Sequence, residues 1–125
     1  MKKVVVLYGG LNERIGAIKI IRDIYQNRIN NVKTFFDDGE RNFDFDELSY
    51  FAGILNYAMQ RNPEIIILHE IRSKEVIEKL MSAFQCEIYT MYIGKYTSNK
   101  HDITITVNSD ENLETQIKEI FEKLI

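Results

Sequence analysis

The chain has 125 residues, which is enough for one domain with a sizeable core and too few for two. Its 45% hydrophobic and 28% charged residues are ordinary for a soluble globular protein. The formal net charge of −3 argues against general binding to nucleic-acid phosphates. No apolar run approaches the ~18 residues of a membrane span. The single cysteine, Cys86, favours the reducing cytoplasm. We therefore expect neither a nucleic-acid partner nor membrane insertion.

Short apolar runs alternate with stretches whose apolar residues recur every three to four positions, which is typical of strands alternating with helices. The runs predict five strands, at Lys3–Tyr8, Val32–Phe36, Ile65–Glu70, Cys86–Ile93 and Ile103–Val107. The helices predicted between and after them cover 12–27, 44–62, 73–84 and 108–124. This alternation predicts βαβ units, hence a three-layer α/β/α fold around a five-stranded, mostly parallel sheet. We expect residues 1–125 to form one such domain.

Polar residues that can cap a helix precede each predicted helix. Asn12 and Ser73 stand before the first and third helices, and Asn108–Asp110 before the last. Asp44 is followed three residues later by Glu47, the spacing of a capping box, and this pair is predicted to start the second helix.

The stretch Asp37–Asp46 is acidic and polar and is predicted to be a loop. A solvated loop explains these carboxylates, and no EF-hand spacing is present. We expect no metal site, and Asp37 and Asp38 are the carboxylates to examine first for a divalent cation. Two histidines and one cysteine also allow no zinc-ligand pattern.

Pro63–Glu64 is followed by the apolar run Ile65–Leu68 and then by His69–Arg72. This order resembles the Walker B region of secretion and type IV pilus motor ATPases. The resemblance implies a P-loop NTPase-like fold with the strand order 5-1-4-3-2, although a flavodoxin-like order, 2-1-3-4-5, fits the sequence as well. It also implies that Glu70 is the base that polarises water and that Arg72 organises the site. Alternatively, these two side chains form an exposed ion pair, which contributes ~0–1 kcal/mol.

The Walker A motif that should accompany this segment, Gly-x-x-x-x-Gly-Lys-Ser/Thr, is largely absent. Only Gly9 of the segment Gly9–Gly16 matches, and Ile15 stands at the lysine position. An apolar residue there removes a charge-assisted contact of about 1.5–3 kcal/mol, so Mg·ATP is disfavoured as a cofactor. Gly9, Gly10 and Arg14 could still form a modified phosphate site at the helix N-terminus. The other interpretation is a turn that needs glycines for steric reasons.

We therefore expect a non-catalytic P-loop NTPase-like subunit with a binding, regulatory or structural role. The resemblance links it to a secretion or pilus-type ATPase system, with a protein partner or a second copy. The alternatives are a weak nucleotide or phosphate binder, a small nucleotide kinase-like enzyme, and a flavodoxin-like module. Asp102–Glu114 is similar to the end of nucleoside monophosphate kinases, but Gly94–His101 does not supply their arginine-rich lid.

Overall fold

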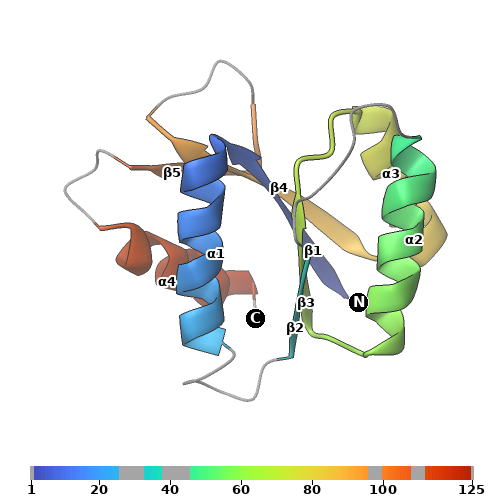
Figure 1. The fold of residues 1–125 in the computed structure, drawn as a ribbon, viewed down its shortest axis with the longest axis horizontal. Coiled ribbons are helices and arrows are strands. Elements are labelled where there is room, and N and C mark those ends of the chain that lie inside the picture. Colours follow the sequence, from blue (N-terminus) through green and yellow to red (C-terminus); the bar gives the residue numbers. More distant parts are fainter. Residues whose placement is uncertain (1, 26–32, 38–45, 96–99, 108–111, 125) are drawn as a thin grey trace.

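The computed structural model describes residues 2–25, 33–37, 46–95, 100–107 and 112–124. Its strands are β1 (Lys3–Gly9), β2 (Thr34–Phe36), β3 (Ile65–His69), β4 (Glu87–Gly94) and β5 (Ile103–Thr106). Its helices are α1 (Leu11–Tyr25), α2 (Glu47–Gln60), α3 (Lys74–Phe84) and α4 (Leu113–Leu124). The strands form one parallel sheet, with α1 and α4 on one face and α2 and α3 on the other (Figure 1). The predicted three-layer α/β/α fold is therefore confirmed.

The strand order is β2-β3-β1-β4-β5, which corrects both orders considered from the sequence. The order 5-1-4-3-2 separates β1 from β3, but Val4 is in register with Ile66 of β3 and with Ile88 of β4. The order 2-1-3-4-5 pairs β2 with β1, but β2 pairs with β3. The sequence could not decide between these orders because β1, β3 and β4 are each rich enough in apolar residues to suit the middle of a parallel sheet.

The chain changes direction within the sheet after β2. From β1 it crosses over β3 to the edge strand β2, and it then runs back through β3 and past β1 to β4 and β5. Right-handed crossovers in opposite directions place α1 on one face and α2 and α3 on the other. The carboxyl ends of β1 and β3 are consequently the topological switch point, where open α/β sheets bind ligands.

The alternation of side chains along the strands divides the hydrophobic core into two clusters. Val5 and Leu7 pack toward α1 and α4, whereas Val4 and Val6 pack toward α2 and α3. The residues of β3 alternate in the same way. Each fully buried aliphatic side chain stabilises the fold by about 1.5–3 kcal/mol relative to exposure, so these two strands anchor both layers.

The start of α2 differs from the prediction. Asp46 is the N-cap, and its Oδ1 accepts a hydrogen bond from Ser49 N at 3.3 Å. Of the predicted capping box, Glu47 is the first helical residue, whereas Asp44 lies outside the described residues. Asp46 stands three residues before Ser49, whose backbone N–H has no partner within the helix, so its side chain can cap that group.

The structure describes side-chain caps at the starts of α3 and α4. Ser73 caps α3 as predicted, because its Oγ accepts from Val76 N at 3.3 Å. The cap of α4 is Asn112, whose Oδ1 accepts from Thr115 N at 2.8 Å. The predicted start at Asn108–Asp110 lies outside the described part of the chain. No helix among the described residues is long and apolar enough to cross a membrane.

Candidate functional site at the switch point

The turn between β1 and α1 contains a single residue outside both elements, Gly10. Leu11 is already helical, and Arg14 N donates to Gly10 O at 3.0 Å, so the first helical turn closes on Gly10. The predicted cap Asn12 therefore lies within the first turn. A P-loop needs several residues between strand and helix, because its backbone N–H groups must wrap a phosphate. This turn offers no such segment.

Gly9 is required at this turn for steric reasons. Its φ of +112° is a conformation that residues with a side chain rarely adopt. A Cβ on Gly9 would also lie 2.1 Å from the carbonyl oxygen of Ile93, its neighbour on β4. The geometry of Gly9 thus follows from the close packing of β1 against β4 and does not depend on a ligand.

Glu13 places a carboxylate beside the start of α1. A Cβ built on Gly10 would lie 2.2 Å from Glu13 Oε2, so this side chain folds back over the turn. The helix dipole favours a carboxylate at this end of a helix, and a glutamate three residues after the cap is typical of a capping box. A phosphate at the same helix end would have to displace this negative charge.

Arg14 reaches toward β3. Its Nη1 lies 3.3 Å from Nδ1 of the buried His69. Because a guanidinium group only donates, Nδ1 of His69 is the acceptor in this contact. The backbone N of His69 donates to Oδ2 of the buried Asp37 at 3.1 Å. Arg14, His69 and Asp37 thus connect the start of α1 with the carboxyl ends of β3 and β2.

The catalytic candidates Glu70 and Arg72 face a different side of the sheet. Both are exposed and line a cleft of about 910 Å³ between α3, β4 and residues 100–102, together with Tyr8 and Ile88. Tyr8 and Ile88 belong to the α2 and α3 side of the core. Ile65 and Ile67, which share a face of β3 with His69, pack on the α1 side. Glu70 and Arg72 thus line the cleft on the α3 side, whereas Arg14 contacts His69, the residue before Glu70.

Glu47 holds the segment that carries Arg72. Its two carboxylate oxygens accept hydrogen bonds from the backbone N of Arg72 and of Ser73, each at 2.9 Å. These bonds satisfy two backbone donors just before α3 and connect the start of α2 with the start of α3. The sequence suggested only a local capping role for Glu47, because nothing in it shows that residues 47 and 72 are neighbours.

An aromatic stack at the cleft was not foreseen from the sequence. The ring of His101 contacts the ring of Tyr8, at 4.8 Å between centroids, and the ring of Tyr92, at 5.5 Å. Tyr8 Oη donates to Ile71 O at 2.5 Å, and burial of Tyr8 raises its pKa to about 12. These residues come from three separate segments, so local patterns gave no signal for the stack.

The described residues contain no group of three or more His, Cys, Asp or Glu side chains placed to hold a metal ion. Asp37 is buried and accepts from the backbone of His69, and Asp38 lies outside the described residues. Cys86 is buried, and this burial raises the pKa of its thiol, which disfavours the reactive thiolate.

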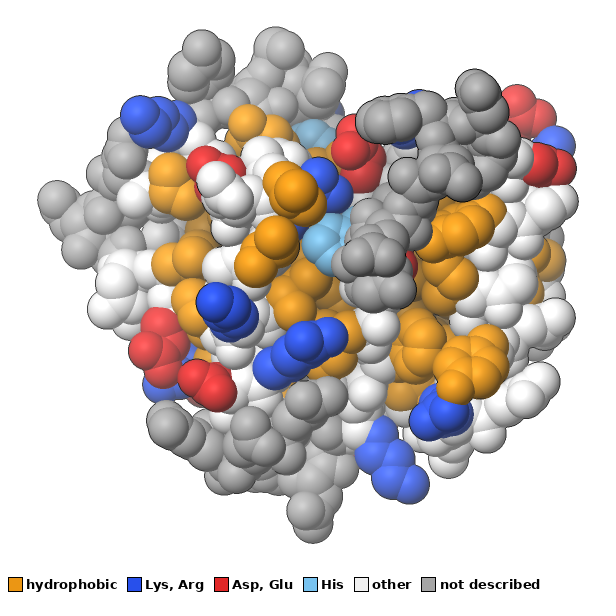
Figure 2. All heavy atoms as spheres, viewed as in Figure 1, with side chains coloured by type: hydrophobic (Ala, Val, Ile, Leu, Met, Phe, Trp, Pro, Cys, Tyr) orange, Lys and Arg blue, Asp and Glu red, His pale blue; other side chains and the backbone are white. Residues whose placement is uncertain are grey.

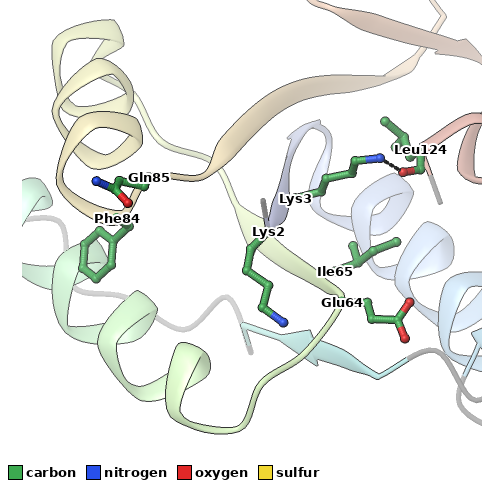
Figure 3. A pocket seen from close by; sticks show the side chains of 7 residues that line it. All are labelled: Lys2, Lys3, Glu64, Ile65, Phe84, Gln85 and Leu124. Atoms are coloured by element: carbon green, nitrogen blue, oxygen red, sulfur yellow. Dashed lines mark hydrogen bonds between the residues drawn. The ribbon is translucent and has the colours of Figure 1, made fainter.

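A second hollow, of about 500 Å³, lies at the amino ends of β1 and β3, away from the switch point (Figure 3). Lys3 Nζ donates to the carbonyl oxygen of Leu124 across this hollow. Lys2 Nζ donates to Asn62 Oδ1 at 2.6 Å. Because both ammonium groups already have partners here, the hollow is a weaker candidate for ligand binding than the carboxyl edge.

No protein-family model and no curated protein sequence matches this chain. Among solved structures, it is similar to "Hexameric APS kinase from Thiobacillus denitrificans", with a TM-score of 0.58 and 12% sequence identity. The similarity covers 98% of this chain and 29% of that chain. At this identity the similarity establishes the fold alone: an α/β domain with a five-stranded parallel sheet in the order β2-β3-β1-β4-β5.

Proposed function

We propose that this domain is a cytoplasmic, non-catalytic binding or regulatory subunit that uses a P-loop-kinase-like fold as its frame. The observation that carries this proposal is the one-residue turn at Gly10. Without a loop, the backbone of this turn offers no cradle for the β- and γ-phosphates of a nucleotide. The Glu13 carboxylate over the turn would also repel the phosphates of a nucleotide. The residues present therefore do not fit Mg·ATP.

Ile15 supports the same proposal. It lies within α1, one turn after Leu11, and is 42% exposed. At this position a P-loop protein carries the lysine that neutralises phosphate charge. With no cation at position 15 to hold a phosphate, a base at Glu70 would have no phosphoryl group to act on.

A protein partner or a second copy is the expected ligand. The narrower link to a secretion or pilus-type ATPase rests on the Pro63–Arg72 segment alone. The strand order that this resemblance implied is not the one observed. We therefore propose the partner only as a protein, without choosing a motor system.

Calorimetric titration of Mg·ATP, Mg·GTP and their diphosphates into the purified protein tests the proposal, with a phosphate-release assay alongside. We expect no binding heat up to about millimolar nucleotide. A Kd of about 1 mM corresponds to a binding free energy of only about −4 kcal/mol. We also expect no turnover. Micromolar affinity or steady phosphate release would contradict the non-catalytic proposal.

A second candidate function, weak binding of a phosphate group, is favoured by one observation. Arg14 Nε is buried and has no hydrogen-bond partner among the described residues, although Nη1 contacts His69. An anion beside Arg14 would satisfy this donor. Titrating inorganic phosphate into wild type, Arg14→Lys and Glu13→Gln separates the two functions. Binding that Arg14→Lys weakens and Glu13→Gln strengthens would support an anion site, whereas three identical blank titrations would exclude it.

A further inference from the structure

β2 forms the edge of the sheet, and among the described strands only β3 pairs with it. Asp37 N donates to Ile67 O at 2.9 Å, and Lys33 O accepts from the first residue of β3 at 3.3 Å. In a parallel ladder, alternate residues direct both backbone groups toward the same neighbour. The N–H and C=O groups of Thr34 and Phe36 therefore point away from β3. Such a row of outward groups is a template for one more strand.

The two faces of β2 each carry an aromatic side chain and an arginine. On the α1 side, the guanidinium carbon of Arg22 lies 4.7 Å from the centroid of the Phe36 ring. On the α2 side, the rings of Phe35 and Tyr57 meet edge to face at 5.9 Å between centroids. The guanidinium carbon of Arg61 lies 4.6 Å from the Tyr57 ring centroid, and Arg61 donates to the tyrosine hydroxyl. An added strand would therefore meet apolar surface and a cation on each face.

Among the described exposed residues beside this edge, cations outnumber acids by three to two, although the whole chain carries −3. Lys33 immediately precedes β2 and is exposed, like Arg22 and Arg61. The described exposed acids that neighbour them in sequence are Asp23 and Glu64. Figure 2 shows Lys and Arg side chains gathered in the lower middle of the molecule, around the place where Figure 1 draws β2. An acidic partner is therefore complementary to this edge.

We propose that the β2 edge binds a partner protein by strand addition, and that the added strand alternates acidic with apolar residues. Its backbone pairs with Thr34 and Phe36. Its apolar side chains contact the aromatic surface, and its carboxylates lie near Arg22 and Arg61. A second copy bound through the same edge is disfavoured, because a two-fold contact would bring like-charged arginines of both copies together. The β2 edge is separate from the turn at Gly10. A failure of strand addition would therefore not bear on whether the domain binds nucleotide.

Two substitutions at Thr34 test the backbone contact. Thr34→Pro removes the outward N–H while leaving the ladder with β3 intact, which is why proline is tolerated on edge strands. Thr34→Val is the matched control, because it keeps this N–H and the shape of the side chain. The Thr34 hydroxyl is buried without a hydrogen-bond partner among the described residues, so the control loses no hydrogen bond. Circular dichroism confirms that both variants are folded.

Charge reversals test the electrostatic part of the proposal. Arg22→Glu and Arg61→Glu each place a negative charge on one face of the edge. Lys79→Glu is the control, because this exposed lysine is on α3 and pairs with Glu75 there. The probe is a fluorescein-labelled peptide, Gly-Glu-Val-Glu-Val-Glu-Val-Gly, followed by fluorescence anisotropy. A second peptide has lysine in place of each glutamate.

We expect the acidic peptide to bind and the lysine peptide not to bind. Thr34→Pro should weaken binding about tenfold, and each arginine reversal about fivefold, while both controls match wild type. The proposal is overturned if the acidic peptide does not bind, if both peptides bind equally, or if Thr34→Pro binds like Thr34→Val. Sedimentation that reveals a dimer abolished by Thr34→Pro would also overturn it, because the occupant would then be a second copy.

Discussion

Replacing Gly9 by alanine perturbs the turn on which the functional proposal depends. The φ of +112° would strain an alanine by about 1–3 kcal/mol. The new Cβ would lie 2.1 Å from the carbonyl oxygen of Ile93, so β1 and β4 would have to separate. Overpacking of this kind costs about another 1–3 kcal/mol. We expect Gly9→Ala to lower the free energy of unfolding by about 2–6 kcal/mol, a large part of the roughly 5–15 kcal/mol of a typical domain.

Urea unfolding followed by circular dichroism measures this loss, and Gly53→Ala provides the control. Gly53 is exposed on α2, and nothing lies within 4 Å of a Cβ built there. That substitution should stabilise the protein by about 0.5–1 kcal/mol. With an m-value of about 2 kcal/mol per molar urea, the midpoint of Gly9→Ala should fall by about 1–3 M. A midpoint for Gly9→Ala within about 0.3 M of wild type would show that the turn relaxes freely, which would refute the reasoning.

Three further predictions concern local contacts. Ser73→Ala should lower the free energy of unfolding by about 1 kcal/mol, because α3 loses its N-cap; urea melts showing no loss would mean that Ser73 does not cap. Thr34→Val should stabilise the protein by about 1 kcal/mol by removing a buried, unpaired hydroxyl, and a lower melting temperature would show that this hydroxyl has a partner. Hydrogen bonds from Ser49 lower the pKa of Asp46 below its ordinary value of 3.8. The ionised carboxylate therefore stabilises the fold above pH 3.8, and this contribution is lost as pH falls through the folded-state pKa. The stability advantage of wild type over Asp46→Asn should accordingly shrink between pH 7 and pH 3 in thermal melts, and an advantage independent of pH would disprove the role of the charge.

The strands and the cap of α3 could be predicted because each leaves a local pattern in the sequence. A run such as Ile65–Leu68 is recognisable by itself, and so is Ser73 before an apolar helical stripe. Strand order is not local: β1, β3 and β4 all carry buried apolar residues, so any of the three could have been central. The motor-ATPase resemblance supplied an order that the pairing of β1 with β3 corrects.

The candidate site was harder to predict for two physical reasons. Aligning Gly9–Gly16 with a P-loop assumed that these residues form a loop, whereas α1 already begins at Leu11. The available signal was Glu13, three residues after Gly10, which is the spacing of a residue that folds back on a helix start. The contact of Arg14 with His69 spans 55 positions, and only the sheet topology brings such residues together.

The most direct test of a non-catalytic domain is a calorimetric titration of Mg·ATP into Ile15→Lys beside wild type. This substitution restores the charge of the Walker A lysine but leaves the one-residue turn at Gly10 unchanged. We predict no measurable affinity for either protein, because a lysine without a phosphate cradle is insufficient. Micromolar binding by Ile15→Lys would show that the frame still holds a nucleotide and that only the lysine is missing, and binding by wild type would contradict the proposed function outright.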